Sequence, residues 1–261
     1  MKKIIFSAII LAIPAFLLMP AGCKNAAKSK TDSTAVAPVA VKDTINIISQ
    51  ADSAQGWKLL FDGKTFTNWT GYNADSIPPR WQIKDGMLYT EGKKQIGNDK
   101  ELTLDIMTRD QFENFELSWE WKITAQGNSG VMYHVEQGKY PETFATGPEY
   151  QLLDDKGWPE KLKAAQYSGS DYDMYPAMNA TVKPVGEWNQ SLIKVQGPKV
   201  EHWLNGVKVV EYELWSPDWK KKVKESKWKD YPGYGLSKTG HIALQDHGTE
   251  VYFRAIRIRP L

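Results

Sequence analysis

The chain has 261 residues with 33 Lys or Arg and 31 Asp or Glu, a formal net charge of +2 at pH 7 that gives no sign of a nucleic-acid-binding surface. Its charged fraction of 25% and apolar fraction of 41% are ordinary for a globular protein and exclude collagen, a polytopic membrane protein and a wholly disordered chain. A single Cys excludes an internal disulfide framework and a Cys-based zinc site, while 11 Trp, 12 Tyr and 8 Phe make the chain rich in aromatic side chains.

The first residues have the pattern of a lipoprotein signal peptide. A basic start precedes an apolar run over residues 4–19, which is short for a membrane span and typical of a signal peptide. Small residues then precede Cys23, which resembles a bacterial lipobox, although Pro20 stands where a lipobox usually has Leu. We therefore predict a signal peptide over residues 1–22, lipidation of Cys23, and a location in the Gram-negative cell envelope, in the periplasm or on the outer-membrane surface. A plain secretory signal with an incidental Cys is the alternative.

Residues 23–53 are predicted to be a flexible tether. They are rich in Lys, Ala, Ser, Thr, Asp and Val and contain no aromatic residue, so they cannot bury enough apolar surface to offset their chain entropy. A short strand or helix is expected at most near residues 45–48. The folded domain is then expected over residues 54–261, a length that suits one β-sandwich or one α/β domain.

Almost all of the predicted folded domain has a sequence pattern typical of β-strands. Asp85-Gly86 and Asn205-Gly206 are typical of tight hairpin turns. One helix is expected over residues 217–228, because Ser216 suits the N-cap and Pro217 the first helical position; its basic run is expected to face solvent. Many short strands and one short helix favour an antiparallel β-sandwich. Strands are expected at residues 57–61, 81–83, 87–89, 115–123, 130–135, 150–153, 191–196, 201–204, 207–212, 241–245 and 251–258.

In these strands one face is apolar and the other carries side chains able to do chemistry. Solvent exposure alone explains any one polar face, but Glu, Gln, Asn and His are unusual there. If the strands are neighbours, these faces form a groove suited to carbohydrate chemistry. The buried side is expected to hold Trp119, Trp121, Tyr133 and Tyr150. The candidate functional residues are Glu120, Lys122, Asn128, His134, Glu149, Gln151, Gln245 and His247.

Several of these candidates have plainer explanations. Glu120 and Lys122 could form a surface ion pair, and Asp154, a further candidate, could belong only to a turn. The chain has no phosphate loop, dinucleotide fingerprint, His-Glu-x-x-His or Gly-x-Ser-x-Gly motif. Gln151 stands where a glycosidase with paired carboxylates on one strand needs a second carboxylate, which disfavours that mechanism here.

Motifs spread over the whole folded part resemble one family, the 3-keto-disaccharide hydrolases. The final motif, Gly240-His241-Ile242-Ala243-Leu244-Gln245-Asp246-His247-Gly248, is the most specific. Two positions depart from the family pattern: His134 stands where many members have Arg, and Ala255 where Asn is usual. The other matching segments are residues 56–65, 68–69, 120–123, 127–130, 147–154, 186–189, 202–206 and 253–258.

The resemblance implies an all-β, concanavalin A-like jelly-roll sandwich with one or two short helices, secreted or lipid-anchored. It also implies hydrolysis of glycosides that a separate oxidoreductase has oxidised at C3 of the sugar. A ketone at C3 acidifies the hydrogen at C2, so a base can remove it, the group at C1 can leave by elimination, and water can add back.

Roles for this chemistry are a hypothesis on the candidate residues. Either His134 or Glu149 is the base; Gln151, Lys122 or Asn128 stabilises the enolate oxygen; His247 with Gln245 protonates the leaving group or binds substrate hydroxyls. Glu120 and Asp154 complete the predicted site. No cofactor is certain, but a divalent metal such as calcium could replace Lys122 as the electrophile.

A carbohydrate-binding surface lipoprotein without catalytic activity is the alternative function, and it would explain the aromatic content equally well. The expected partners are a carbohydrate substrate, the sugar 3-oxidoreductase that supplies it, and a membrane reached through the lipid anchor. No nucleic-acid partner is expected.

Overall fold

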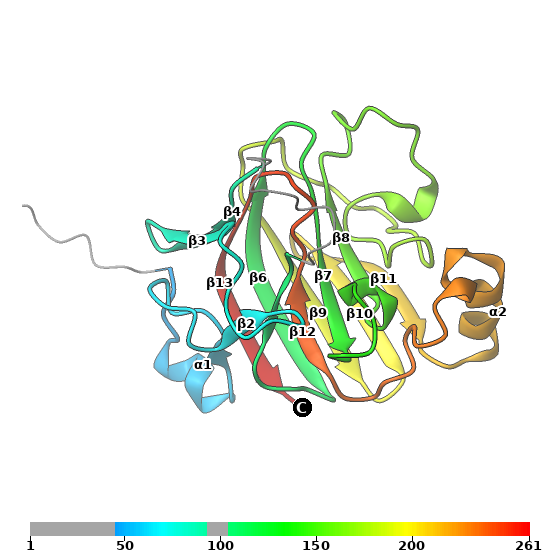
Figure 1. Ribbon diagram of the computed structural model, residues 1–261, viewed down its shortest axis with the longest axis horizontal. Helices are drawn as coiled ribbons and strands as arrows, with labels where there is room; N and C mark the ends of the chain where they lie inside the picture. The colour runs from blue at the N-terminus through cyan, green and yellow to red at the C-terminus, as the bar shows by residue number, and fades with distance from the viewer. Residues whose placement is uncertain (1–44, 93–103) are drawn as a thin grey trace, which may run out of the picture. The chain divides into compact units, whose positions relative to one another are not determined.

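The computed structural model describes residues 45–92 and 104–261 as two antiparallel sheets with short helices at their edges (Figure 1). The predicted signal peptide, Cys23 and most of the predicted tether lie outside the described residues. None of the helices in residues 45–92 and 104–261 combines the length and the hydropathy that a membrane crossing requires.

The larger sheet has eight strands and the smaller sheet has five. The larger sheet runs in the order β11 (Val207–Glu213), β10 (Lys199–Leu204), β9 (Asn189–Gln196), β6 (Phe115–Ile123), β13 (Val251–Pro260), β4 (Met87–Thr90) and β3 (Trp81–Lys84), with β1 (Lys58–Leu59) also paired to β13. The smaller sheet runs in the order β2 (Trp69–Gly71), β5 (Ile106–Thr108), β12 (His241–Leu244), β7 (Asn128–Val135) and β8 (Glu149–Leu153).

The core lies between the two sheets, where alternate residues of their strands meet. Trp119 of β6 packs edge-on against Tyr150 of β8, with ring centroids 5.0 Å apart. The predicted burial of Trp119, Trp121, Tyr133 and Tyr150 is confirmed, since each is at most 1% exposed. Much of the aromatic content is therefore sandwich core, and the all-β, jelly-roll class is confirmed.

The strands expected from the sequence are all present, and the boundaries of β6 agree to the residue. Two strands were not foreseen, β2 and β5, because three-residue strands carry too little alternation to be recognised. Helix α2 (Pro217–Glu225) begins as expected, with the Ser216 hydroxyl accepting from the Trp219 amide at 3.1 Å. The described residues also include three 3₁₀ helices: η2 (Thr143–Ala145), η3 (Ala164–Gln166) and η4 (Lys227–Asp230).

The described residues also include a helix where the end of the tether is predicted. Helix α1 (Gln50–Ala54) is capped by Ser49, whose hydroxyl accepts from the Asp52 amide at 3.0 Å. Asp52 in turn pairs with Arg257 of β13 at 3.2 Å. This short helix is held against the sheet by polar contacts rather than by apolar burial, which the sequence pattern does not reveal.

A stack of aromatic rings attaches α2 and η4 to the edge of the sandwich. Tyr175, Tyr212 of β11, Trp219 of α2, Tyr234 and Trp228 of η4 lie nearly parallel in succession, with centroids 4.1 to 5.6 Å apart. Parallel rings at this spacing contribute packing and a preferred orientation beyond simple area burial. The stack therefore fixes the position of η4, which begins with Lys227.

Candidate active site

Four predicted site residues lie together on the face of the smaller sheet that points away from the core. Asn128 is on β7, Glu149 and Gln151 are on β8, and Gln245 follows β12, held by its amide to the Gly130 carbonyl at 3.0 Å. Tyr150 of β8 points the opposite way, into the sandwich. Strand alternation thus predicted this polar face correctly for β8 and for Asn128 of β7.

The Glu149 carboxyl is held in a confined position above Gly130. A Cβ atom at residue 130 would lie 2.2 Å from Oε1 of Glu149, so only glycine leaves room for this side chain. The Gln151 amide lies 3.2 Å from Oε1 of Glu149 and from the Ser129 carbonyl; turned so that its nitrogen faces them, it donates to both. Glycine and the amide together fix the orientation of the carboxyl.

Burial raises the pKa of Glu149 to about 8, because the charged form loses most of its hydration. The positive charge of Lys227 opposes this shift, while the negative charges of Asp105 and Asp173 add to it. A carboxyl with such a pKa exchanges a proton near neutral pH, which is the property that general acid–base catalysis needs.

A second buried carboxyl, Asp105, lies just before β5 on the same face. Its Oδ2 accepts from the Thr143 hydroxyl at 2.5 Å and its Oδ1 accepts from the Asp246 amide at 2.9 Å. Burial raises the pKa of Asp105 to about 7 despite these two hydrogen bonds. The sequence analysis missed Asp105; its one signal is a carboxylate inside an apolar run, between Leu104 and Ile106.

Lys227 brings the opposing positive charge, and it too was missed. Its ammonium nitrogen lies 4.3 Å from the Tyr172 ring centroid, 4.4 Å from that of Trp228 and 5.7 Å from that of Phe144. Lys227 keeps substantial solvent exposure, as the basic run predicts, but burial of its ammonium end lowers its pKa while Glu149 opposes that shift. A cation in an aromatic cage interacts more strongly with a nearby anion than one in open water.

The segment after Gln245 continues the polar face. The Asp246 carboxylate pairs with Arg80 at 2.7 Å and accepts from the Gly248 amide at 2.9 Å. His247 is exposed, and its ring centroid lies 6.4 Å from that of Trp158. His247 is thus a solvent-exposed imidazole two residues after Gln245.

Glu120 and Lys122 lie elsewhere, on the outer face of the larger sheet. Glu120 pairs with Arg254 at 2.7 Å, and the Lys122 ammonium lies 4.4 Å from the Tyr252 ring centroid. The prediction that both share a groove with Glu149 is wrong, because alternation gives the face of a strand and not the sheet to which the strand belongs.

His134 is also separated from Glu149, because the backbone breaks its alternation there. Its φ of 55° accompanies a register shift between β7 and β12, a local bulge that turns the side chain. The ring packs against Phe115, with centroids 5.9 Å apart, and Nε2 lies 2.9 Å from the Glu113 carbonyl. The predicted shared face with Asn128 is therefore wrong, and burial lowers the pKa of His134.

Asp154 closes a loop next to the site. Its two carboxylate oxygens accept from the amides of Gln126 and Gly157, each at 2.9 Å. This geometry matches the turn that the sequence also allowed, and substrate binding by Asp154 stays a prediction. Within residues 45–92 and 104–261, no group of three or more His, Cys, Asp or Glu is placed to hold a metal ion, so the divalent metal stays a prediction as well.

Glu149→Gln is expected to flatten the pH dependence of stability. Since the native carboxyl holds its proton up to about pH 8, the unfolded chain ionises first and the wild type loses stability as pH rises from about 4.5 to 8. The variant lacks this loss, which is on the order of 5 kcal/mol for a pKa raised from 4.5 to about 8. Denaturant unfolding between pH 5 and 9 measures it, with Glu120→Gln as the control carboxyl on the other sheet. Parallel curves for wild type and Glu149→Gln would contradict the raised pKa.

The chain is similar in sequence to one known family over most of its length. The family model of the 3-keto-α-glucoside-1,2-lyase-like domain matches residues 56–259. A curated protein from Bacteroides thetaiotaomicron, named 3-keto-disaccharide hydrolase, is 32% identical over 294 aligned positions that cover all of both chains.

Solved structures show the same architecture. A candidate glycosyl hydrolase from Parabacteroides distasonis is 41% identical, with a TM-score of 0.77, covering 83% of this chain and 99% of its own. A second candidate glycosyl hydrolase from the same organism is 28% identical, with a TM-score of 0.59, covering 78% of this chain and 99% of its own.

Proposed function

The chain belongs to the 3-keto-α-glucoside-1,2-lyase-like family and is a glycoside hydrolase; from this premise we propose that it cleaves glycosides carrying a ketone at C3 of the sugar. The single observation that supports the proposal is the buried Glu149 carboxyl on the outer face of the smaller sheet. Burial raises its pKa to about 8, and the positive charge of Lys227 on η4 opposes this rise. The name of the Bacteroides relative and the family description support the same substrate class.

In the proposed reaction Glu149 removes the proton from C2, and the electrons of that C–H bond form the enolate of the C3 ketone. The enolate then re-forms the ketone, its electrons make a C1–C2 double bond, and the C1–O bond breaks as the leaving oxygen gains a proton. Water next adds across C1 and C2, giving a hydroxyl at C1 and a hydrogen at C2. The net result is hydrolysis without a second nucleophilic carboxylate.

The residues around Glu149 have distinct parts in this proposal. Lys227 stabilises the negative enolate oxygen and holds the pKa of Glu149 below the value that burial alone would give. Gln151 keeps the Glu149 carboxyl aligned through their 3.2 Å contact. His247, the exposed imidazole at the end of the polar face, supplies the proton for the leaving oxygen, with Gln245 as a partner for substrate hydroxyls.

The proposal extends to the setting of the enzyme. Because the elimination needs a ketone at C3, an oxidoreductase that oxidises the C3 hydroxyl must act before it.

We also propose that Cys23 is lipidated and anchors the protein in the cell envelope. Replacing Cys23 by Ala should move the protein from the membrane fraction to the soluble fraction, and an unchanged distribution would contradict the anchor.

The reaction type is tested with a 3-keto-disaccharide deuterated at C2. If proton removal from C2 limits the rate, this substrate turns over more slowly than one deuterated at C1, whereas direct displacement at C1 gives no such primary effect. The unoxidised parent disaccharide should not be cleaved.

Glu149→Gln is expected to lower kcat by about 10²-fold or more, the usual contribution of a general base. Binding of both sugars without turnover would instead support a lectin.

Lys227→Met is expected to move the pH–rate profile as well as to lower the rate. If Glu149 is the base, kcat/KM rises through about pH 8, and removing the positive charge displaces this rise to higher pH, because Lys227 lowers the pKa of Glu149. Lys224→Met, an exposed lysine of α2, is the matched control. A profile that is lowered without being displaced would remove Lys227 from the electrostatics of Glu149.

A further inference from the structure

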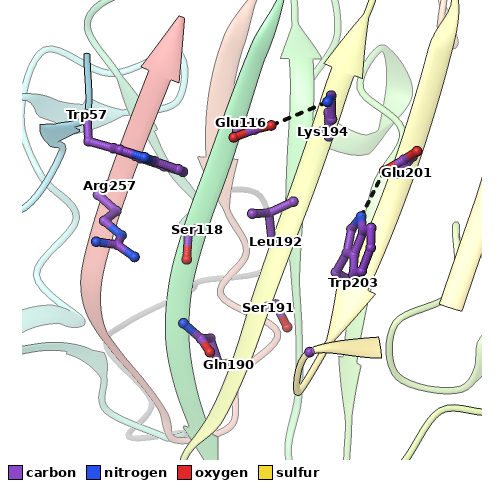
Figure 2. A pocket seen from close by; sticks show the side chains of 11 residues that line it. Trp57, Glu116, Ser118, Gln190, Ser191, Leu192, Lys194, Glu201, Trp203 and Arg257 are labelled. Atoms are coloured by element: carbon purple, nitrogen blue, oxygen red, sulfur yellow. Dashed lines mark hydrogen bonds and ion pairs between the residues drawn. The ribbon is translucent and has the colours of Figure 1, made fainter. Parts of the chain in front are cut away.

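A pocket of about 340 Å³ lies on the outer face of the larger sheet, on the other side of the sandwich from Glu149 (Figure 2). Trp57 borders it over β13 and Trp203 borders it on β10, with β6 and β9 between them. Ser118 and Leu192 lie between the two indole rings. None of these residues takes part in the chemistry proposed for the smaller sheet.

The charges around this pocket are already paired within the protein. Glu116 pairs with Lys194 at 3.4 Å and also with Arg259. Arg257 pairs with Asp52 at 3.2 Å. A charged ligand would have to break these pairs without a compensating partner, so the lining favours an uncharged one.

Two polar side chains of the lining are left with hydrogen-bonding capacity. In the part of the chain that the structure describes, neither the Ser118 hydroxyl nor the Gln190 side-chain amide bonds to another protein group. A hydroxyl and an amide can both donate and accept, which suits a ligand that carries many hydroxyl groups.

The two indoles complete the recognition surface, and Trp203 is the freer of them. Trp203 is half-buried, its Nε1 donates to Glu201 at 2.9 Å, and no aromatic ring or cation among the described residues stacks on it. The Trp57 ring, by contrast, lies 4.9 Å from the Arg257 guanidinium and 5.2 Å from that of Arg259. An indole face presented beside hydroxyl-binding groups fits the apolar C–H face of a sugar ring.

We propose that this pocket is a second carbohydrate site, which binds an uncharged oligosaccharide without cleaving it. A neighbouring pocket of about 230 Å³ shares Ser118, Gln190 and Arg257 with the first, so the site continues along the sheet beyond one sugar unit. It would hold an unmodified stretch of glycan on one face of the enzyme while the oxidised unit reacts at the other face or on another molecule.

The site is tested by titrating the full chain with unoxidised, neutral gluco-oligosaccharides in a calorimeter. Trp203→Ala is expected to weaken binding about tenfold, equivalent to about 1.4 kcal/mol, while turnover of a small 3-keto-disaccharide stays unchanged. Glu149→Gln should lose turnover and keep this binding. Trp188→Ala removes a half-buried Trp just before β9 that does not line the pocket, and it is the matched control.

Gln190→Arg covers the case in which Trp203→Ala fails to fold, because residue 190 is exposed and the added charge and bulk only obstruct the pocket. It too should weaken binding. The proposal is overturned if the wild type binds no neutral oligosaccharide, or if binding is lost in Glu149→Gln and kept in Trp203→Ala. Neither result bears on turnover of the 3-keto substrate, so failure of this proposal is distinguishable from failure of the proposed function.

Discussion

Burial of one carboxyl group is the constraint on which the proposed chemistry of this protein depends. Glu149 is buried above Gly130, where any larger residue would collide with it, and loss of hydration raises its pKa to about 8. A neighbouring negative group, Asp105, raises that pKa further, and the Lys227 ammonium limits the rise. The balance of these effects leaves a carboxyl group that exchanges its proton near neutral pH, at a cost in stability that the rest of the sandwich offsets.

The aromatic side chains make this balance possible in two ways. Trp119, Trp121, Tyr133 and Tyr150 fill the space between the sheets, and Tyr150 anchors β8 to this core. The parallel stack that ends at Trp228 fixes η4, and with it Lys227, whose ammonium group lies near three aromatic rings and whose charge lowers the pKa of Glu149. Aromatic side chains thus build the core and position the charge of Lys227. On the opposite face, the aromatic side chain of Trp203 borders the pocket.

The two outer faces of the sandwich differ in how their charges are arranged. On the larger sheet Glu116, Glu120 and Arg257 are all paired with opposite charges, so these side chains carry little unpaired charge. On the smaller sheet two carboxyls are buried with raised pKa values and only part of the compensation that they need. Unbalanced electrostatics of this kind are typical of catalytic sites, and balanced ones of binding surfaces or plain exposed faces.

Local patterns in the sequence determined the longer strands, the hairpin turns, the start of α2 and the faces of β6 and β8, because alternation and turn chemistry act over a few neighbouring residues. The three-residue strands β2 and β5 are too short to show such a pattern. Tertiary structure alone decided which faces meet. Strand pairing put Glu120 and Lys122 on the other sheet, and a backbone bulge turned His134 away. The fold also placed Asp105 and Lys227, which are 122 residues apart in the sequence, where their charges affect the pKa of Glu149. Burial and charge at Glu149 depend on those distant neighbours, so its raised pKa is a property of the fold and not of the strand that carries it.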